Sequence, residues 1–168
     1  TMASAGNTTD FGNLSGVRQL AAPANSTTRG VFAGGDGSGG SSSNVIDFIT
    51  FSSAGNATDF GDLLAANQQC NSCSNDTRGL VSGGFAGGTI TSGNARSNII
   101  DYVTIASAGN ALDFGDLVTA TKTFPSGVSS GTRAVFGGGD DSGGKTNAMQ
   151  YVTISSTGNT LDFGNLSS

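Results

Sequence analysis

Asp-Phe-Gly-Asn-Leu occupies residues 10–14 and again residues 162–166, and Asp-Phe-Gly-Asp-Leu occupies residues 59–63 and 113–117. The steps between successive copies are 49, 54 and 49 residues. Self-similarity at a period of about 50 residues is typical of proteins built from stacked structural units. The chain is therefore predicted to be a tandem array of three similar units.

The units differ in length in only one stretch. An arginine follows each of the first three aspartates by 19, 19 and 20 residues, and an asparagine precedes each of the last three by 15 residues. Between arginine and asparagine the spacing is 15, 20 and 14 residues, and this stretch is rich in glycine. Such variation indicates a surface loop on a constant scaffold. We expect loops at 36–43, 85–97 and 139–146, all at the same edge of successive units.

Each unit carries signals for four β-strands. The strongest strand is rich in β-branched and aromatic residues, and a Ser-Ala-Gly-Asn or Ser-Thr-Gly-Asn turn and the Asp-Phe-Gly strand follow it. A third strand begins at each periodic arginine, and a weaker segment precedes it. The strongest strands are expected at 44–51, 98–105 and 147–154, and the weaker segments at 15–26, 64–75 and 118–130.

The strongest strand is apolar on both faces. In its first copy Val45, Ile49 and Phe51 alternate with Ile46 and Phe48. A sheet with one face in water would leave that face polar, so both faces should be covered by neighbouring sheets. Four-stranded antiparallel sheets stacked around an axis are the blades of a β-propeller.

The predicted fold is therefore all-β, with three four-stranded propeller blades in each chain. We expect a partial blade at 1–14, blade one at 15–63, blade two at 64–117, and blade three with an overlapping piece at 118–168. Because propellers usually contain 4–8 blades, we expect a second copy, or further units of a longer polypeptide, to complete the ring. The alternative fold is a β-trefoil or β-prism, for which three units of this size are natural.

Composition excludes several classes of function. The 168 residues include 28 Gly, 23 Ser and 19 Thr, but no Glu, His or Trp, and the net charge is −5. Few strong helix formers are present. Without histidine, Ser-His-Asp catalysis and His-ligated metal sites are absent. Negative charge disfavours nucleic acid and anionic membranes as partners, and no apolar stretch approaches the roughly 20 residues of a membrane-spanning helix.

The order of arginine strand, Gly-Gly, variable loop, aromatic strand, turn and second aromatic resembles the kelch repeat. Phe11, Phe60, Phe114 and Phe163 stand where kelch blades usually carry Trp. The variant with Ser-Ala-Gly-Asn, Asp-Phe-Gly-Asp-Leu and Thr-Arg-Gly resembles repeat modules in virion proteins of tailed phages, particularly those that infect cyanobacteria. The resemblance covers the whole chain and implies a propeller fold and a role in a fibre or spike.

Two short motifs favour structural interpretations. Asp-Phe-Gly is also a kinase signature, but it occurs four times here without the other kinase motifs. The stretch 35–40 fits a dinucleotide-binding pattern, but a Ser-rich loop and a strand follow it, where that pattern needs a helix. Neither motif therefore predicts a nucleotide site.

The periodic charged residues are predicted to be structural, because a binding site rarely needs the same group in every unit. We favour hydrogen-bonded pairs between strands or blades over a ligand site. The residues are Asp10, Asp59, Asp113, Asp162, Arg29, Arg78 and Arg133.

Cys70 and Cys73 form a C-x-x-C pair in the weaker segment of the second unit. A redox site would need a helix N-terminus, and a zinc site would need two further ligands. A local disulfide or two free thiols are both consistent with the spacing.

The non-repeated residues expected to contact a partner lie in the variable loops and are Asp36, Phe85, Arg96, Asp140, Asp141 and Lys145. Calcium coordination by Asp36, Asp140 and Asp141 fits no known loop pattern, and solvated turns are favoured. No cofactor or metal is expected.

We expect a non-enzymatic structural or adhesion module of a virion fibre or another extracellular assembly. Its partners would be copies of itself or further repeats, with a cell-surface glycan or receptor at the loops. The alternatives are a carbohydrate-binding lectin of the β-trefoil or β-prism type and, as the weakest candidate, a propeller enzyme. Copper oxidases of the propeller class need His ligands, and sialidases usually need an Arg cluster with a Tyr nucleophile, which the two periodic Tyr residues do not supply.

Overall fold

The computed structural model describes residues 7–86, 96–121 and 126–167, and these residues form strands and connections but no helix. The all-β prediction is therefore confirmed for the described chain. The weak segment 118–130 and the loop 85–97 are described only in part, because residues 122–125 and 87–95 lie outside the described residues, as do residues 1–6 of the predicted partial blade and residue 168.

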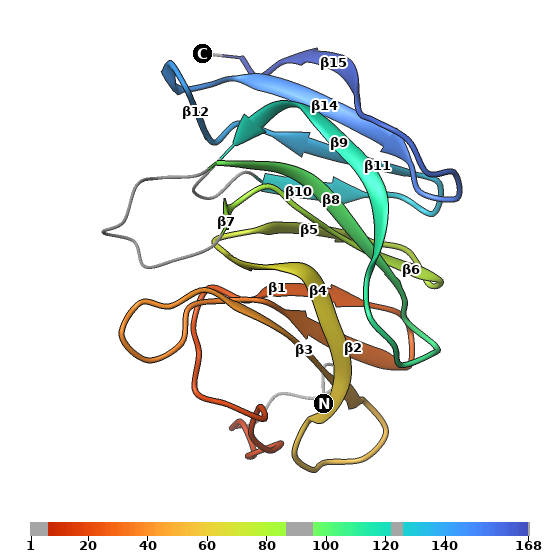
Figure 1. Ribbon diagram of the computed structural model, residues 1–168. Coiled ribbons are helices and arrows are strands. Elements are labelled where there is room, and N and C mark those ends of the chain that lie inside the picture. The colour runs from red at the N-terminus through yellow and green to blue at the C-terminus, as the bar shows by residue number, and fades with distance from the viewer. Residues whose placement is uncertain (1–6, 87–95, 122–125, 168) are drawn as a thin grey trace.

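Three antiparallel sheets follow one another along the chain and stack face to face, with the N-terminal sheet at the bottom of Figure 1 and the C-terminal sheet at the top. The first contains β1 (Ala22–Asn25), β2 (Arg29–Ala33), β3 (Ser43–Thr50), β4 (Thr58–Gln68) and the short β7 (Phe85–Ala86). The second contains β5 (Asn71–Ser74), β6 (Arg78–Ser82), β8 (Ser97–Thr104) and β9 (Leu112–Thr121). The third contains β10 (Ser126–Ser129), β11 (Arg133–Gly137), β14 (Ala148–Thr153) and β15 (Leu161–Asn165), beside a hairpin of β12 (Asp140–Asp141) and β13 (Gly144–Lys145).

Within each sheet the first four strands are neighbours in chain order, as expected for short turns between antiparallel strands. The registers repeat from sheet to sheet. Arg29 lies opposite Thr50, Arg78 opposite Thr104, and Arg133 opposite Thr153. The repeat seen in the sequence is therefore a repeat of backbone pairing.

The outer strand of each unit is longer than the sequence predicted. β4 continues past Leu63 to Gln68, and Asn67 and Gln68 pair with β7, which belongs to the connection between β6 and β8. The same strand thus begins on its own sheet and ends beside the next unit. This continuation crosses the predicted boundary between residues 63 and 64.

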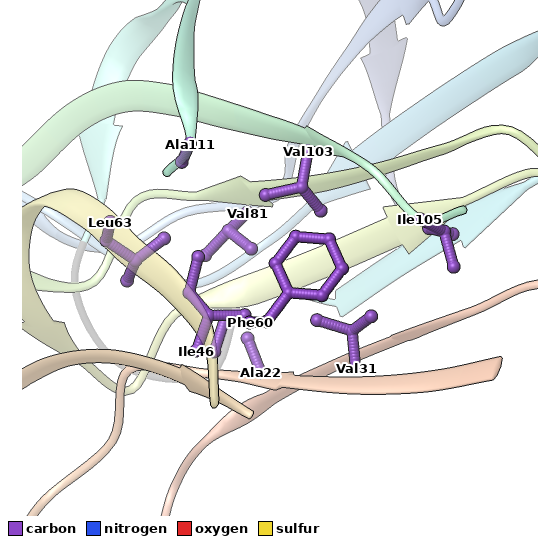
Figure 2. Packing of buried hydrophobic residues seen from close by; sticks show 10 residues of the cluster. Ala22, Val31, Ile46, Phe60, Leu63, Val81, Val103, Ile105 and Ala111 are labelled. Carbon is purple, nitrogen blue, oxygen red and sulfur yellow. The ribbon is translucent and has the colours of Figure 1, made fainter. Parts of the chain in front are cut away.

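Apolar side chains from two neighbouring sheets fill each space between them. In the first cluster Phe60 is 3% exposed and lies at the centre of side chains from both sheets (Figure 2). The first sheet contributes Val31, Ile46 and Leu63 as well, and the second contributes Val81, Val103, Ile105 and Ala111. A second cluster between the second and third sheets contains Leu80, Ile100, Phe114 and Leu117 with Phe136, Val152 and Ile154. Both faces of the middle sheet are therefore covered, which explains the doubly apolar strands.

Backbone hydrogen bonds tie the same two sheets together at their outer strands. Gly109 N–H donates to the Phe60 carbonyl at 2.7 Å, and Ala111 N–H donates to the Asp62 carbonyl at 2.8 Å. The Asn110 Oδ1 atom accepts from Asp62 N–H at 3.1 Å. The Gly-Asn turn of one unit is thus bonded to the Asp-Phe-Gly strand of the unit before it.

The glycine of Asp-Phe-Gly makes this contact possible. A Cβ atom added to Gly61 would lie 2.5 Å from the Gly109 carbonyl oxygen, and its φ of 143° is one that other residues rarely adopt. Gly164 of the third unit has a positive φ of 117° too, but a Cβ atom there would meet no atom within 4 Å. Only the unit that follows distinguishes the two positions.

We predict that Gly61→Ala lowers the free energy of unfolding by about 1–3 kcal/mol more than Gly164→Ala does, because both carry backbone strain but only Gly61→Ala also forces two sheets apart. Urea unfolding at low protein concentration measures both variants. Equal losses of stability would mean that the close approach between sheets is not constraining.

Candidate functional site: repeated contacts and two open faces

The periodic arginine of each unit lies over an aromatic ring of its own sheet. The guanidinium carbon of Arg78 is 4.7 Å from the centroid of the Tyr102 ring, which meets Phe114 edge to face at a centroid separation of 5.9 Å. The other two units repeat both contacts, with Arg29, Phe48 and Phe60 in the first and Arg133, Tyr151 and Phe163 in the third. The arginine, the aromatic of the third strand and the Asp-Phe-Gly phenylalanine are therefore one packed unit.

The same arginine also reaches the next sheet. Arg78 Nη1 donates to the Ile154 carbonyl at 2.9 Å, and Arg29 Nη1 donates to the carbonyls of Ile105 and Ala106 at 3.2 and 2.9 Å. Arg133 occupies the matching place on the third sheet, where no following sheet of the described chain offers a carbonyl. The periodic arginines therefore join each sheet to the next.

The periodic aspartates do not pair with these arginines, which corrects one sequence-based interpretation. Asp59 Oδ1 accepts from Gly61 N–H at 3.2 Å, and Asp10, Asp113 and Asp162 repeat this bond to the glycine two residues later. The carboxylates are held by their own turns, whereas the arginines find backbone carbonyls. Both sets are structural, but each has its own partners.

A buried polar position on the third strand was missed by the sequence analysis. Asp47 is fully buried and forms a 2.9 Å ion pair with Arg18, and it accepts from the N–H and hydroxyl groups of Ser15 at 3.0 and 2.9 Å. In the third unit Gln150 takes this place and accepts from Val118 N–H at 2.7 Å. Alignment of the units shows Asp, Asp and Gln within an apolar strand, and this was the available signal.

Asp101 holds the same position in the second unit without an arginine partner. Its Oδ2 atom accepts from Leu64 N–H at 3.2 Å, and its Oδ1 atom has no hydrogen-bond partner. Burial raises the pKa of Asp101 to about 6; the Leu64 hydrogen bond opposes this shift, and the charge of Asp113 adds to it.

The two cysteines are free thiols, so the predicted local disulfide is absent from the structure. Cys73 is buried in the cluster between the second and third sheets, whereas Cys70 packs against the cluster between the first and second. Burial raises the pKa of each thiol to about 12. Both groups are therefore neutral at physiological pH and face different cores.

The loop residues predicted to contact a partner divide into two sets. Asp36 and Phe85 are 4% and 7% exposed, so burial removes them from a partner-contact surface. Arg96 Nη2 forms a 3.1 Å ion pair with Asp140, and this pair links the loops of the second and third units. Asp141 accepts from Gly143 N–H at 2.7 Å, and Lys145 is exposed opposite Asp140 in the β12–β13 hairpin.

The described residues contain no group of three or more His, Cys, Asp or Glu side chains placed to hold a metal ion. No helix able to cross a membrane occurs in the described chain.

The outward face of the third sheet carries the residues that pack between sheets elsewhere, but it is open. Phe163 and Leu166 are 47% and 45% exposed, whereas Phe114 and Leu117 at the same positions of the second unit are 2% and 4% exposed. Arg133 and Tyr151 lie on the same open face.

The outward face of the first sheet is also incompletely covered. Phe51 is 47% exposed, although Ile105 and Ile154 at the matching positions are fully buried. Residues 11–14 lie on this face as an Asp-Phe-Gly strand does elsewhere, since Gly55 N–H donates to the Phe11 carbonyl at 2.7 Å. Beside them remains an apolar pocket of about 230 Å³, lined also by Phe32 and Ile49. The first and third sheets thus expose opposite halves of one type of interface.

We predict that Arg78→Ala lowers the free energy of unfolding by about 1.5–3 kcal/mol, because it removes a charged hydrogen bond to the next sheet. The matched variant Arg133→Ala should cost less than about 1 kcal/mol, since it loses only the contact with an aromatic ring. Denaturant unfolding of dilute protein compares them. If Arg133→Ala is as destabilising as Arg78→Ala, the arginine acts within its own sheet alone.

Asp101 should make stability depend on pH. Between about pH 4 and pH 6 the unfolded chain loses the Asp101 proton while the folded chain keeps it, so the free energy of unfolding falls as pH rises through this window. Asp101→Asn removes the ionisation, and we expect the variant to gain about 1–3 kcal/mol relative to the native chain between pH 4 and pH 7. Urea unfolding at four pH values measures both. Parallel profiles for the two chains would exclude a proton held at Asp101.

No known protein family matches the chain, and no curated protein is significantly similar to it. The resemblance to kelch repeats and to phage virion modules therefore enters only as a proposal below.

Proposed function

We propose that the protein is a non-enzymatic structural and adhesion module of a virion fibre or another extracellular assembly, and that its stacked sheets are blades of a kelch-like β-propeller. The observation that carries the proposal is the use of the periodic residues. The repeated phenylalanine, glycine and arginine each contact the next unit. A repeat whose fixed residues serve stacking is suited to building an assembly, and it leaves its variable loops for recognition.

The packing of the first strands supports a propeller arrangement. Asn25 N–H donates to Ser74 Oγ at 3.1 Å, and Ser129 Oγ donates to the Ser74 carbonyl at 2.7 Å. The Ser72 hydroxyl also donates to the Pro23 carbonyl. The first strands β1, β5 and β10 of successive sheets are thus bonded side by side, as the innermost strands of neighbouring blades are around an axis.

The connections β2–β3 and β11–β14 support a recognition role at one edge. Because the strands of each sheet alternate in direction, these connections lie at the opposite end from the β1–β2 turns. In Figure 1 the β2–β3 loop and the β12–β13 hairpin both emerge at the left of the view. Asp141 and Lys145 are available there beside glycine and serine, and such polar groups can bind the hydroxyls of a cell-surface glycan or a polar receptor surface.

We predict that replacing residues 140–145 by a Gly-Ser turn abolishes binding to the glycans recognised by the native protein on a glycan array, while the thermal unfolding midpoint changes little. The matched control is Asp76→Ala in the β5–β6 turn at the opposite edge, which should keep binding. Absence of glycan binding by the native protein, or full binding by the hairpin variant, would contradict recognition at this edge.

A further inference from the structure

The two open faces of the chain are complementary in the same way as the two sides of each internal interface. Between the first and second sheets, Phe60, Leu63 and Ile46 meet Val81, Val103 and Ile105. The third sheet exposes the equivalents of the first set, including Phe163 and Leu166. The first sheet exposes the equivalents of the second set, which are Phe32, Ile49 and Phe51.

Polar groups on these faces match as well. Arg133 lies over Tyr151 as Arg78 lies over Tyr102, but it lacks the carbonyl that Arg78 finds at Ile154. On the opposite face, the carbonyl of Phe51 stands at the position of the Ile154 carbonyl. An apolar surface with a guanidinium group therefore faces an apolar surface with an acceptor.

The place of the Asp-Phe-Gly strand on the first sheet is held by residues 10–15 of the same chain. Phe11 and Asn13 accept from Gly55 and Ala57 N–H at 2.7 and 2.8 Å, and Asn56 Oδ1 accepts from Asn13 N–H at 3.0 Å. The segment itself is poorly covered, since Phe11 remains 37% exposed. Residues 162–167 have the identical sequence Asp-Phe-Gly-Asn-Leu-Ser.

We propose that a second copy of this chain docks head to tail on the third sheet, and that residues 162–167 of one copy take the place of residues 10–15 on the first sheet of the next. The exchange replaces one strand by an identical one, so its hydrogen bonds are regained. The added gain is the burial of both open faces, because the third sheet brings β10, β11 and β14 along with the strand. The inference rests on the proposed role in assembly.

A pair of cysteines at the junction tests this arrangement directly. Asp62 and Asn110 are joined by a 3.1 Å hydrogen bond inside the chain, and the equivalent pair between copies is Asn165 with Asn56. After mild oxidation, a mixture of the single variants Asn165→Cys and Asn56→Cys should give a covalent dimer that neither variant gives alone. Asp62→Cys with Asn110→Cys in one chain is the matched positive control, because it should cross-link within the chain.

Concentration-dependent sedimentation gives the second readout. The native chain should associate, and Arg133→Ala should weaken association about tenfold by removing a charged hydrogen bond. Gly164→Val should abolish it, since its side chain would meet the Gly55 carbonyl of the next copy; Lys145→Ala should leave it unchanged. No mixed dimer together with a strictly monomeric native chain would overturn the inference. Neither measurement depends on glycan binding, so the failure of adhesion and the failure of assembly are distinguishable.

Discussion

The structure depends on the contact between an Asp-Phe-Gly strand and the Gly-Asn turn of the next sheet. Gly61 allows the backbones to approach, and the carbonyls of Phe60 and Asp62 then accept from Gly109 and Ala111. Phe60 turns its ring into the space that this contact closes. Fully burying such a ring contributes about 1.5–3 kcal/mol, so the hydrogen bonds and the hydrophobic gain support one another. A small sheet with two apolar faces would be unstable without such a neighbour.

Charge is distributed so that it strengthens stacking without filling the cores with ions. The periodic arginines lie at the rim, over an aromatic ring, and donate to the next sheet. Inside the sheets one polar position is solved differently in each unit: Asp47 pairs with Arg18, Asp101 is a carboxyl of raised pKa, and Gln150 is neutral. The scaffold thus accepts three chemical solutions at one place, provided that the N–H group of the preceding strand has an acceptor.

The fold class, the strands and the stacking of doubly apolar sheets followed from the sequence, because period, spacing and alternation are local properties. The fate of Arg78 did not follow, since the repeat places an aspartate beside it in every unit but gives no direction for either side chain. Arg18 and Asp47 are 29 positions apart and only the first unit has the arginine, so periodicity concealed the pair. Asp36 and Phe85 lie in stretches that vary in length, yet they are buried because the long outer strand of the previous unit covers them.

Hydrogen exchange at the turn amides tests the central claim most directly. Gly109 and Gly158 lie in exposed turns, and their N–H groups bond only to the preceding sheet, at the carbonyls of Phe60 and Phe114. If stacking holds the protein together, these amides exchange only by global unfolding, with the same protection as the central strands β6 and β8. Exchange at the rate of free turn amides in an otherwise protected protein would show that each sheet is stable alone, and would contradict the account.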